Sequence, residues 1–130
     1  MTKVCPFCSA DLDPYMLFQG ELVLGLWDGF PASPGHVLLV TRRHVADWFA
    51  ASPAEQQALI EAIPVARDRI LERGHAPDGF NIGVNVGTAA GQTVMHLHLH
   101  LIPRYAGDVP DPAGGVRFVI PCKANYRGAK

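Results

Sequence analysis

Residues 96–101 have the sequence HLHLHL, a strict alternation between histidine and leucine. Successive side chains on a β-strand point to opposite faces, so this pattern predicts a strand with histidines on one face and leucines on the other. We expect the leucine face to pack against a helix and the histidine face to line a groove. The surrounding segment 94–102 is the clearest strand that the sequence predicts.

Three interpretations of the aligned histidines are open. They could simply cover a polar sheet face, or they could ligate a metal ion. Three alternate residues of one strand span about 13 Å, so a single ion with bonds near 2 Å could be shared by two neighbours at most. In the third interpretation an unprotonated imidazole attacks phosphorus and forms a phosphoramidate, which water then cleaves. A neighbouring histidine would bind the phosphate or move a proton.

Further strands are predicted at 16–19, 22–27, 36–41 and 80–86, with an edge strand at 116–120. A helix should begin at Ser52, because Ser52, Pro53 and Glu55 form the pattern of a capping box, and end near Gly74. Pro64 should kink or split this helix. Strands, one helix and more strands indicate an α+β domain with an antiparallel sheet and the helix on one face.

Length and charge restrict the function. The 130 residues fit one domain, 1–130, and the net charge of -1 without a basic cluster argues against a nucleic-acid partner. No apolar run approaches the roughly 18 residues that a membrane helix needs. The N-terminus lacks the apolar stretch of a signal peptide, so we expect a cytoplasmic protein.

A loop of small and polar residues leads into the histidine strand. Gly91 permits a tight turn, and the backbone N–H groups of such a turn can form an anion-binding nest. Gln92 and Thr93 add side-chain donors that could hold phosphoryl oxygens. The loop therefore fits the phosphate-directed interpretation of the histidines.

The segment 91–104, GQTVMHLHLHLIPR, resembles the signature of the histidine-triad (HIT) family. The segment 33–40, SPGHVLLV, resembles the family's upstream segment, and the opening CPFC at 5–8 is similar to that of many bacterial members. The likeness covers about 5–105, and the tail 106–130 follows it less closely. It implies a HIT-like α+β fold with an antiparallel sheet of about five strands and one main helix plus a short helix on one face.

The resemblance also implies roles for individual residues. His98 matches the nucleophile that attacks the α-phosphorus, and His100 matches a residue that contacts the phosphate and assists proton movement. His36 matches a histidine at the edge of the same pocket and completes the catalytic set. Besides His98 and His100, the residues expected to bind substrate are Asp28, at the ribose hydroxyls, and Asn85, Gly91, Gln92 and Thr93, on the phosphate side.

Cys5 and Cys8 could by themselves be a redox pair, half of a metal site or two unrelated thiols. The resemblance implies a zinc site formed by Cys5, Cys8, His44 and His96. A Cys₂His₂ set closes a tetrahedral coordination shell, so the zinc would be structural.

The implied activity is a nucleotide hydrolase or transferase that cleaves the α-phosphate bond of a dinucleoside polyphosphate or a nucleoside phosphoramidate. A nucleotidyl-His98 would be the intermediate, and a divalent cation such as Mg²⁺ would accompany a polyphosphate. One alternative is a nucleotide-binding regulatory protein without catalysis, and another is a zinc-dependent hydrolase with its metal at the triad. The resemblance implies a homodimer and a small-molecule nucleotide as partner.

Overall fold

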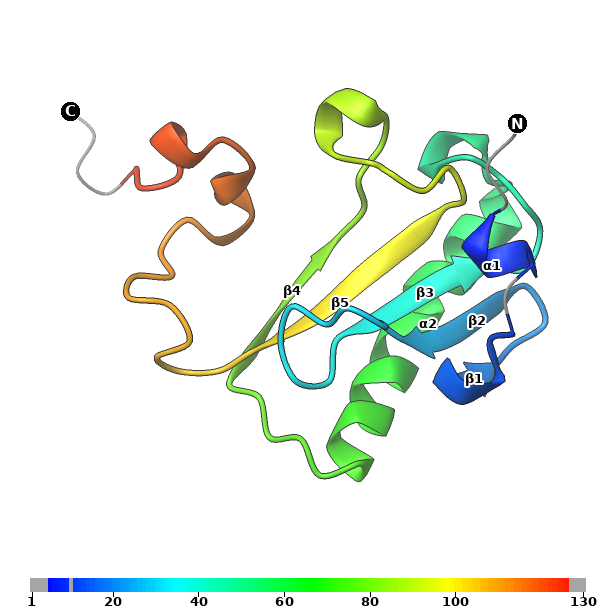
Figure 1. Cartoon of the computed structure of the whole chain (residues 1–130), viewed down its shortest axis with the longest axis horizontal. Coiled ribbons are helices and arrows are strands. Elements are labelled where there is room, and N and C mark those ends of the chain that lie inside the picture. The colour runs from blue at the N-terminus through cyan, green and yellow to red at the C-terminus, as the bar shows by residue number, and fades with distance from the viewer. Residues whose placement is uncertain (1–4, 10, 127–130) are drawn as a thin grey trace.

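A computed structural model describes residues 5–9 and 11–126, and residues 1–4, 10 and 127–130 of the predicted domain lie outside this part. Five antiparallel strands form one sheet in the order β1-β2-β3-β5-β4 (Figure 1). The predicted α+β fold class is therefore confirmed. The elements are α1 (Pro6–Ser9), β1 (Met16–Gln19), β2 (Val23–Trp27), β3 (Val37–Thr41), α2 (Pro53–Glu72), β4 (Gly79–Gly83) and β5 (His98–Arg104).

The main helix α2 begins with the predicted capping box. The Ser52 hydroxyl accepts a hydrogen bond from the Glu55 amide, and the Glu55 carboxylate accepts one from the Ser52 amide. Pro64 lies inside one continuous helix, so the predicted alternative of a split helix is wrong. Buried Leu59 and Ile70 hold the two halves of α2 on the same core. None of the helices in the described ranges could span a membrane.

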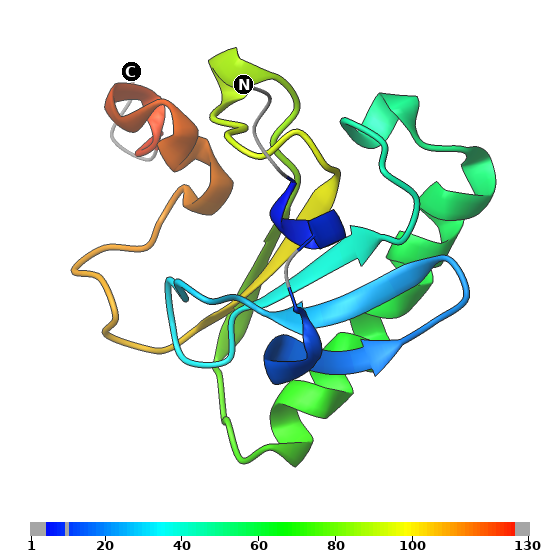
Figure 2. The ribbon, with the colours of Figure 1, turned by 45° about the vertical axis from the view of Figure 1, so that its right-hand side comes forward.

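The two faces of the sheet are covered differently (Figure 2). On one face, alternate residues of β3 and β5 pack against α2, which confirms that the leucines face a helix; this core includes Val37, Leu39, Leu97, Leu99, Leu101, Leu59, Ala62, Ala66 and Ile70. On the other face lies a smaller cluster of Leu24, Leu26, Leu38 and Val40, against which Phe7 of α1 packs. The histidine face is thus the side on which a groove can form.

Some predicted boundaries are wrong. The strand β5 begins at His98 instead of residue 94, because the Leu97 amide donates to the Val45 carbonyl in the loop after β3. β4 ends at Gly83, before residue 86, and β2 begins at Val23. The predicted edge strand at 116–120 is a 3-10 helix, η4 (Gly115–Val119), because Gly114 and Gly115 have positive φ and start a helical turn.

Candidate functional site

The middle histidine of the pattern offers one nitrogen to a cleft. Nδ1 of His98 lies 2.8 Å from the carbonyl oxygen of His96. A carbonyl oxygen only accepts hydrogen bonds, so Nδ1 carries the proton and Nε2 of the neutral ring keeps its lone pair. His98 lines a cavity of about 400 Å³ on the histidine face. An unprotonated ring nitrogen at a cavity wall has the state that a nucleophile requires.

The Ala32 amide determines which nitrogen of His100 carries the proton, because it starts a series of hydrogen bonds that runs through His36. The Ala32 amide donates to Nδ1 of His36 over 2.9 Å, so the proton of neutral His36 resides on Nε2. That nitrogen lies 3.0 Å from Nδ1 of His100, which must then accept. The remaining nitrogen of His100, Nε2, carries a proton and is a donor.

The surroundings of His36 and His100 keep both imidazole rings neutral. Burial lowers the pKa of His100 to about 4, and the neighbouring His98 and His36 act in the same direction. Burial also lowers the pKa of His36, against the opposing effect of Asp28. The Asp28 carboxylate lies 3.4 Å from Nε2 of His36 and accepts a hydrogen bond from the Phe30 amide. The neutral tautomers therefore apply at neutral pH.

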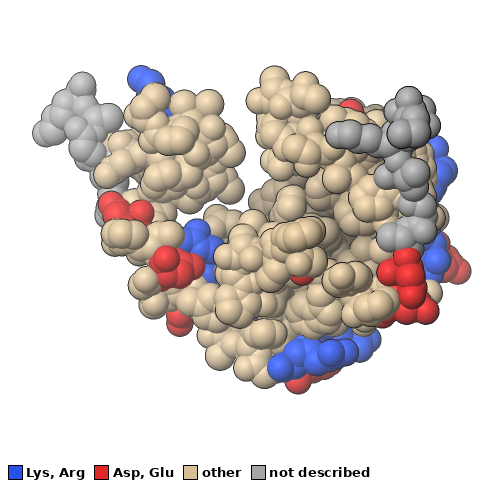
Figure 3. All heavy atoms as spheres, viewed as in Figure 1, with Lys and Arg blue, Asp and Glu red and all other residues tan. Residues whose placement is uncertain are grey.

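Two cavities meet at His100. The first, of about 400 Å³, brings together Asp28, Thr93, His98 and His100, and its wall is largely apolar: Phe7, Leu12, Tyr15, Leu26, Trp27, Phe30 and Leu38. The second, of about 450 Å³, is lined by His36, Asn85 and His100, and by Val116, Phe118 and Val119 of the C-terminal segment. Seen from the histidine face, the middle of the molecule carries mainly uncharged side chains, and the charged ones lie around its rim (Figure 3).

A further cavity lies apart from His98, and its described lining contains no histidine. It holds about 600 Å³ between the loop after β2, the end of β5 and the C-terminal segment, including Arg104, Tyr105 and Asp108. Arg104 and Asp108 form a bidentate ion pair at 2.8 Å, so these two charges compensate each other. The histidines and Asp28 instead line the two cavities described above, which are therefore the candidate site.

The turn before β5 differs from the prediction. Gln92 is buried, and its side chain bonds internally: it accepts from the Gly87 amide and donates to the carbonyls of Ala46 and Val94. The amides of Gly91 and Gln92 donate to carbonyls within the turn. This geometry does not support direct phosphate contact by the Gln92 side chain or a nest built from these two amides. Gly91 provides the positive φ of 93° that the turn needs.

The four predicted metal ligands converge, with donor atoms within 4.8 Å of one another: Cys5, Cys8, His44 and His96. Sγ of Cys5 lies 3.3 Å from Nδ1 of His96, and Sγ of Cys8 lies 3.3 Å from Nδ1 of His44. A tetrahedral zinc ion separates sulfur from nitrogen ligands by about 3.5 Å, given bonds near 2.3 and 2.0 Å. The spacing therefore fits zinc.

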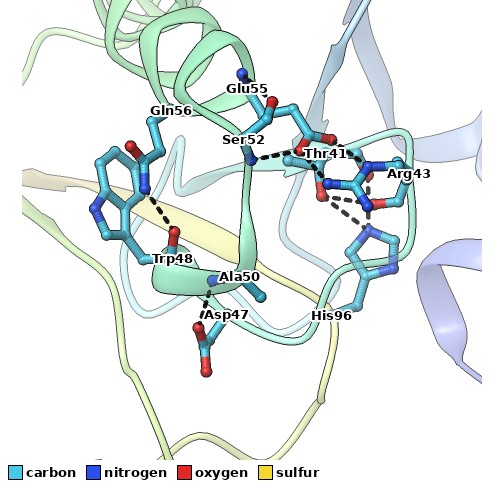
Figure 4. Close-up of polar contacts among 9 residues, drawn as sticks. All are labelled: Thr41, Arg43, Asp47, Trp48, Ala50, Ser52, Glu55, Gln56 and His96. Carbon is cyan, nitrogen blue, oxygen red and sulfur yellow. Dashed lines mark hydrogen bonds and ion pairs between the residues drawn. The ribbon is translucent and has the colours of Figure 1, made fainter.

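The surroundings of these ligands also fit a cation. Nε2 of His96 donates to the Thr41 carbonyl at 2.7 Å (Figure 4). Nδ1 of His96 therefore presents its lone pair to the thiols of Cys5 and Cys8. Metal-bound histidines commonly donate their second N–H in this way. Desolvation and the nearby Cys5 raise the pKa of the Cys8 thiol, so a cation is needed to hold two thiolates side by side.

A second group of donor atoms, from Asp28, His36 and His100, also lies within 4.8 Å, but its hydrogen bonds do not fit a metal. The Ala32 amide donates to Nδ1 of His36, so Nε2 must keep its proton unless the ring becomes an imidazolate. A ligating histidine instead donates its second N–H. The bonding of His36 thus argues against a metal-dependent hydrolase centred on the triad.

The sequence analysis did not predict the apolar wall of the cavity, and Phe7 is the most informative of the residues that it missed. The ring of Phe7 lies 5.5 Å from the rings of both His96 and His98 and forms part of the cavity wall. Its position between Cys5 and Cys8 was the available signal, because ligands that converge must bring the residue between them to the same place.

Comparison with known proteins agrees with this geometry. The family model of the HIT domain matches residues 11–107. Among curated proteins, AP-4-A phosphorylase of Mycobacterium tuberculosis is 33% identical over 100 residues, 76% of this chain and 51% of that protein. Adenylylsulfatase HINT3 of Arabidopsis thaliana is 31% identical over 107 residues, 80% of this chain and 54% of that protein. The chain thus spans about half the length of these two relatives.

Solved structures show the same fold. A HIT family protein from Bacillus anthracis matches with a TM-score of 0.70 and 35% identity, covering 78% of this chain and 73% of that one. The matching proteins thus share both sequence and architecture with the chain.

Proposed function

Because this chain belongs to the histidine-triad family, we propose that it is a nucleotide hydrolase or transferase that acts through a nucleotidyl-His98 intermediate. The observation that carries the proposal is the hydrogen bond from Nδ1 of His98 to the His96 carbonyl. In the neutral ring, it leaves the lone pair of Nε2 beside a cavity with an apolar wall and a carboxylate, Asp28. A nucleobase and a ribose diol are the groups that suit such a wall and such an acceptor.

In the first step, Nε2 of His98 forms a bond to the α-phosphorus while the bond to the leaving group breaks, and the leaving group departs with that electron pair. The N–H at Nε2 of His100 donates to a non-bridging phosphate oxygen and stabilises its developing charge. Water then attacks phosphorus and loses a proton to solvent, and the N–P electron pair returns to His98. The tautomer of His100 supports a role as donor toward phosphate at the start of this sequence.

The leaving group would occupy the second cavity, beyond His100. Its described lining contains His36, His100, amide side chains and apolar side chains, but no Lys or Arg. A phosphoramidate, which releases an amine after that nitrogen takes up a proton, needs no cation there. A dinucleoside polyphosphate releases several negative charges, so we propose that it enters with a divalent cation such as Mg²⁺. The similarity to the relative named AP-4-A phosphorylase supports dinucleoside polyphosphates as the second substrate class.

We propose that Cys5, Cys8, His44 and His96 hold a structural zinc ion. When bound, zinc would cross-link the N-terminal segment to the loop after β3 and to the residues just before β5. All four protein ligands fill the tetrahedral shell, so no position remains for substrate. The measurement is the zinc content of purified protein, with the Cys8→Ser variant as control.

The central test is turnover by wild type and His98→Ala, with diadenosine tetraphosphate and adenosine phosphoramidate as substrates and AMP release as readout. Loss of the nucleophile should reduce kcat by about 10³-fold or more, while the variant still binds AMP. Mass spectrometry after acid-free quenching should locate the nucleotide adduct of wild type on His98. An adduct on another residue would contradict the assignment.

The alternative of a regulatory protein without catalysis has a distinct signature. Wild type would then bind AMP but release none from either substrate. The hydrogen bond from Nδ1 of His98 to the His96 carbonyl favours the enzyme, because it leaves Nε2 facing the cavity and binding alone does not require that orientation.

We propose a homodimer in line with the family. β4 forms an edge of the sheet, and Ile82 on that strand is 46% exposed, so a second chain could cover it. Light scattering on wild type and Ile82→Lys would test this: the variant should shift toward monomer, and a wild type that is already monomeric would refute it.

A further inference from the structure

Phe7 connects the metal centre with the candidate active site. It lies in α1 between Cys5 and Cys8, and its ring meets His96 edge-on at an interplanar angle of 79°. The same ring is tilted by 54° against the ring of His98, at a centroid distance of 5.5 Å. One side chain thus contacts a metal ligand and the proposed nucleophile.

The same side chain forms part of the surface on which a nucleotide would bind. Phe7 is half-buried against the small apolar cluster of the histidine face and lines the 400 Å³ cavity together with Trp27 and Tyr15. An aromatic ring at this place contributes contact area to a planar base. Displacement of Phe7 would therefore open one wall of the cavity.

The position of Phe7 depends on the cysteines. α1 has only four residues, far fewer than a helix needs to be stable alone. The thiol groups of Cys5 and Cys8, at 3.3 and 3.5 Å from Nδ1 of His96, direct this short segment toward the sheet. A cation between these ligands would hold the segment in place, whereas without it the segment depends on the packing of Phe7 and a few neighbours.

We propose that zinc at the Cys5, Cys8, His44 and His96 site and a nucleotide in the cavity strengthen each other's binding, with Phe7 as the coupling residue. This inference rests on the proposed function. Zinc favours the ordered position of α1, and a nucleotide that contacts Phe7 favours that same position. Linkage requires equal effects in both directions. Since one side chain carries the coupling, we expect roughly a fivefold to tenfold effect, at the low end of measured couplings.

The experiment uses the zinc-loaded full chain and AMP. Calorimetry first gives the AMP dissociation constant with zinc bound and after chelation, with circular dichroism confirming that the sheet persists. A competing colorimetric chelator then gives the zinc dissociation constant with and without saturating AMP. Both ratios should show AMP and zinc favouring each other by the same factor. In Phe7→Ala, which keeps all four ligands, one zinc should still bind but the ratio should fall to about one.

Phe30→Ala is the matched control. Phe30 lines the same cavity from the loop after β2 and is 95% exposed, so this variant should keep the wild-type ratio whatever its effect on AMP affinity. A wild type that binds no AMP contradicts the proposed function. A wild type that binds AMP equally in both metal states, or that binds AMP but no zinc, overturns this inference alone. Coupling that survives in Phe7→Ala refutes the role of Phe7.

Discussion

Acidification should destabilise this protein through His100. Its pKa is about 4 in the folded chain because burial and the nearby His98 and His36 disfavour the charged ring. An unfolded histidine has a pKa of about 6.5. Between these two values the unfolded chain binds more protons than the folded chain, so the free energy of unfolding decreases as the pH falls from about 6.5 to 4 and levels off below.

The size of the effect follows from the two pKa values. Because His100 takes up a proton in the unfolded chain, the free energy of unfolding decreases by about 2 kcal/mol from pH 7 to pH 5, and by about 3 kcal/mol from pH 7 to pH 4. For a domain of this length, 2 kcal/mol corresponds to a decrease of about 8 °C in Tm. Asp28 favours the charged ring and acts against this change, but its effect is already part of the pKa of His100.

The assay compares wild type with His100→Asn by urea unfolding at pH 7 and pH 5, with Zn²⁺ in excess because metal ligands also take up protons. The asparagine oxygen can accept the hydrogen bond from Nε2 of His36 but cannot be protonated in this range. His36 and His96, whose pKa values burial also lowers, contribute in both proteins. Wild type should therefore lose about 2 kcal/mol more than the variant. Equal losses in the two proteins would refute the reasoning.

Two further substitutions, with a third as control, test hydrogen bonding and packing within the fold. Gln92→Leu should lower the free energy of unfolding in urea by about 1–3 kcal/mol, since three partly buried backbone groups lose their partner. Unchanged stability with weaker AMP binding would instead support a contact between Gln92 and the phosphate. Gly25→Ala places a Cβ 2.3 Å from the ring of Phe18 and should cost about 1–3 kcal/mol in thermal unfolding. Gly83→Ala, where a Cβ meets nothing within 4 Å, should stay within about 0.5 kcal/mol of wild type.

The features that the sequence predicted correctly depend on local chemistry. Alternation at 96–101 determines which side chains share a face, and the leucines do face α2. Ser52 and Glu55 form their capping box from residues three apart, so no distant contact is needed. The convergence of Cys5 and His96 was accessible only through the family resemblance, because 91 residues separate them and no local rule relates them.

Of the features that the sequence analysis did not predict, two depend on partners remote in sequence and one depends on the turn that precedes the segment. β5 begins late because the Leu97 amide bonds to the loop after β3 instead of to a neighbouring strand. The apolar segment 116–120 has strand-like residues, but two glycines before it start a helical turn. Gln92 was interpreted as a phosphate donor because of its place beside the triad, whereas its partner carbonyl at Ala46 lies 46 residues away.

The tautomers of the three histidines show most clearly what local sequence determines and what it does not. HLHLHL predicts that the histidines share a face, but not which nitrogen each presents there. Backbone groups determine that choice: the Thr41 carbonyl turns the lone pair of His96 toward the thiols, and the His96 carbonyl turns that of His98 toward the cavity. For His100 the Ala32 amide acts through His36 and leaves a donor. Three chemically identical side chains thus acquire the hydrogen bonds that suit the proposed roles of ligand, nucleophile and donor, so substitutions that shift the loop at 28–36 should change the tautomer of His100 while leaving the Nδ1 hydrogen bond of His98 in place.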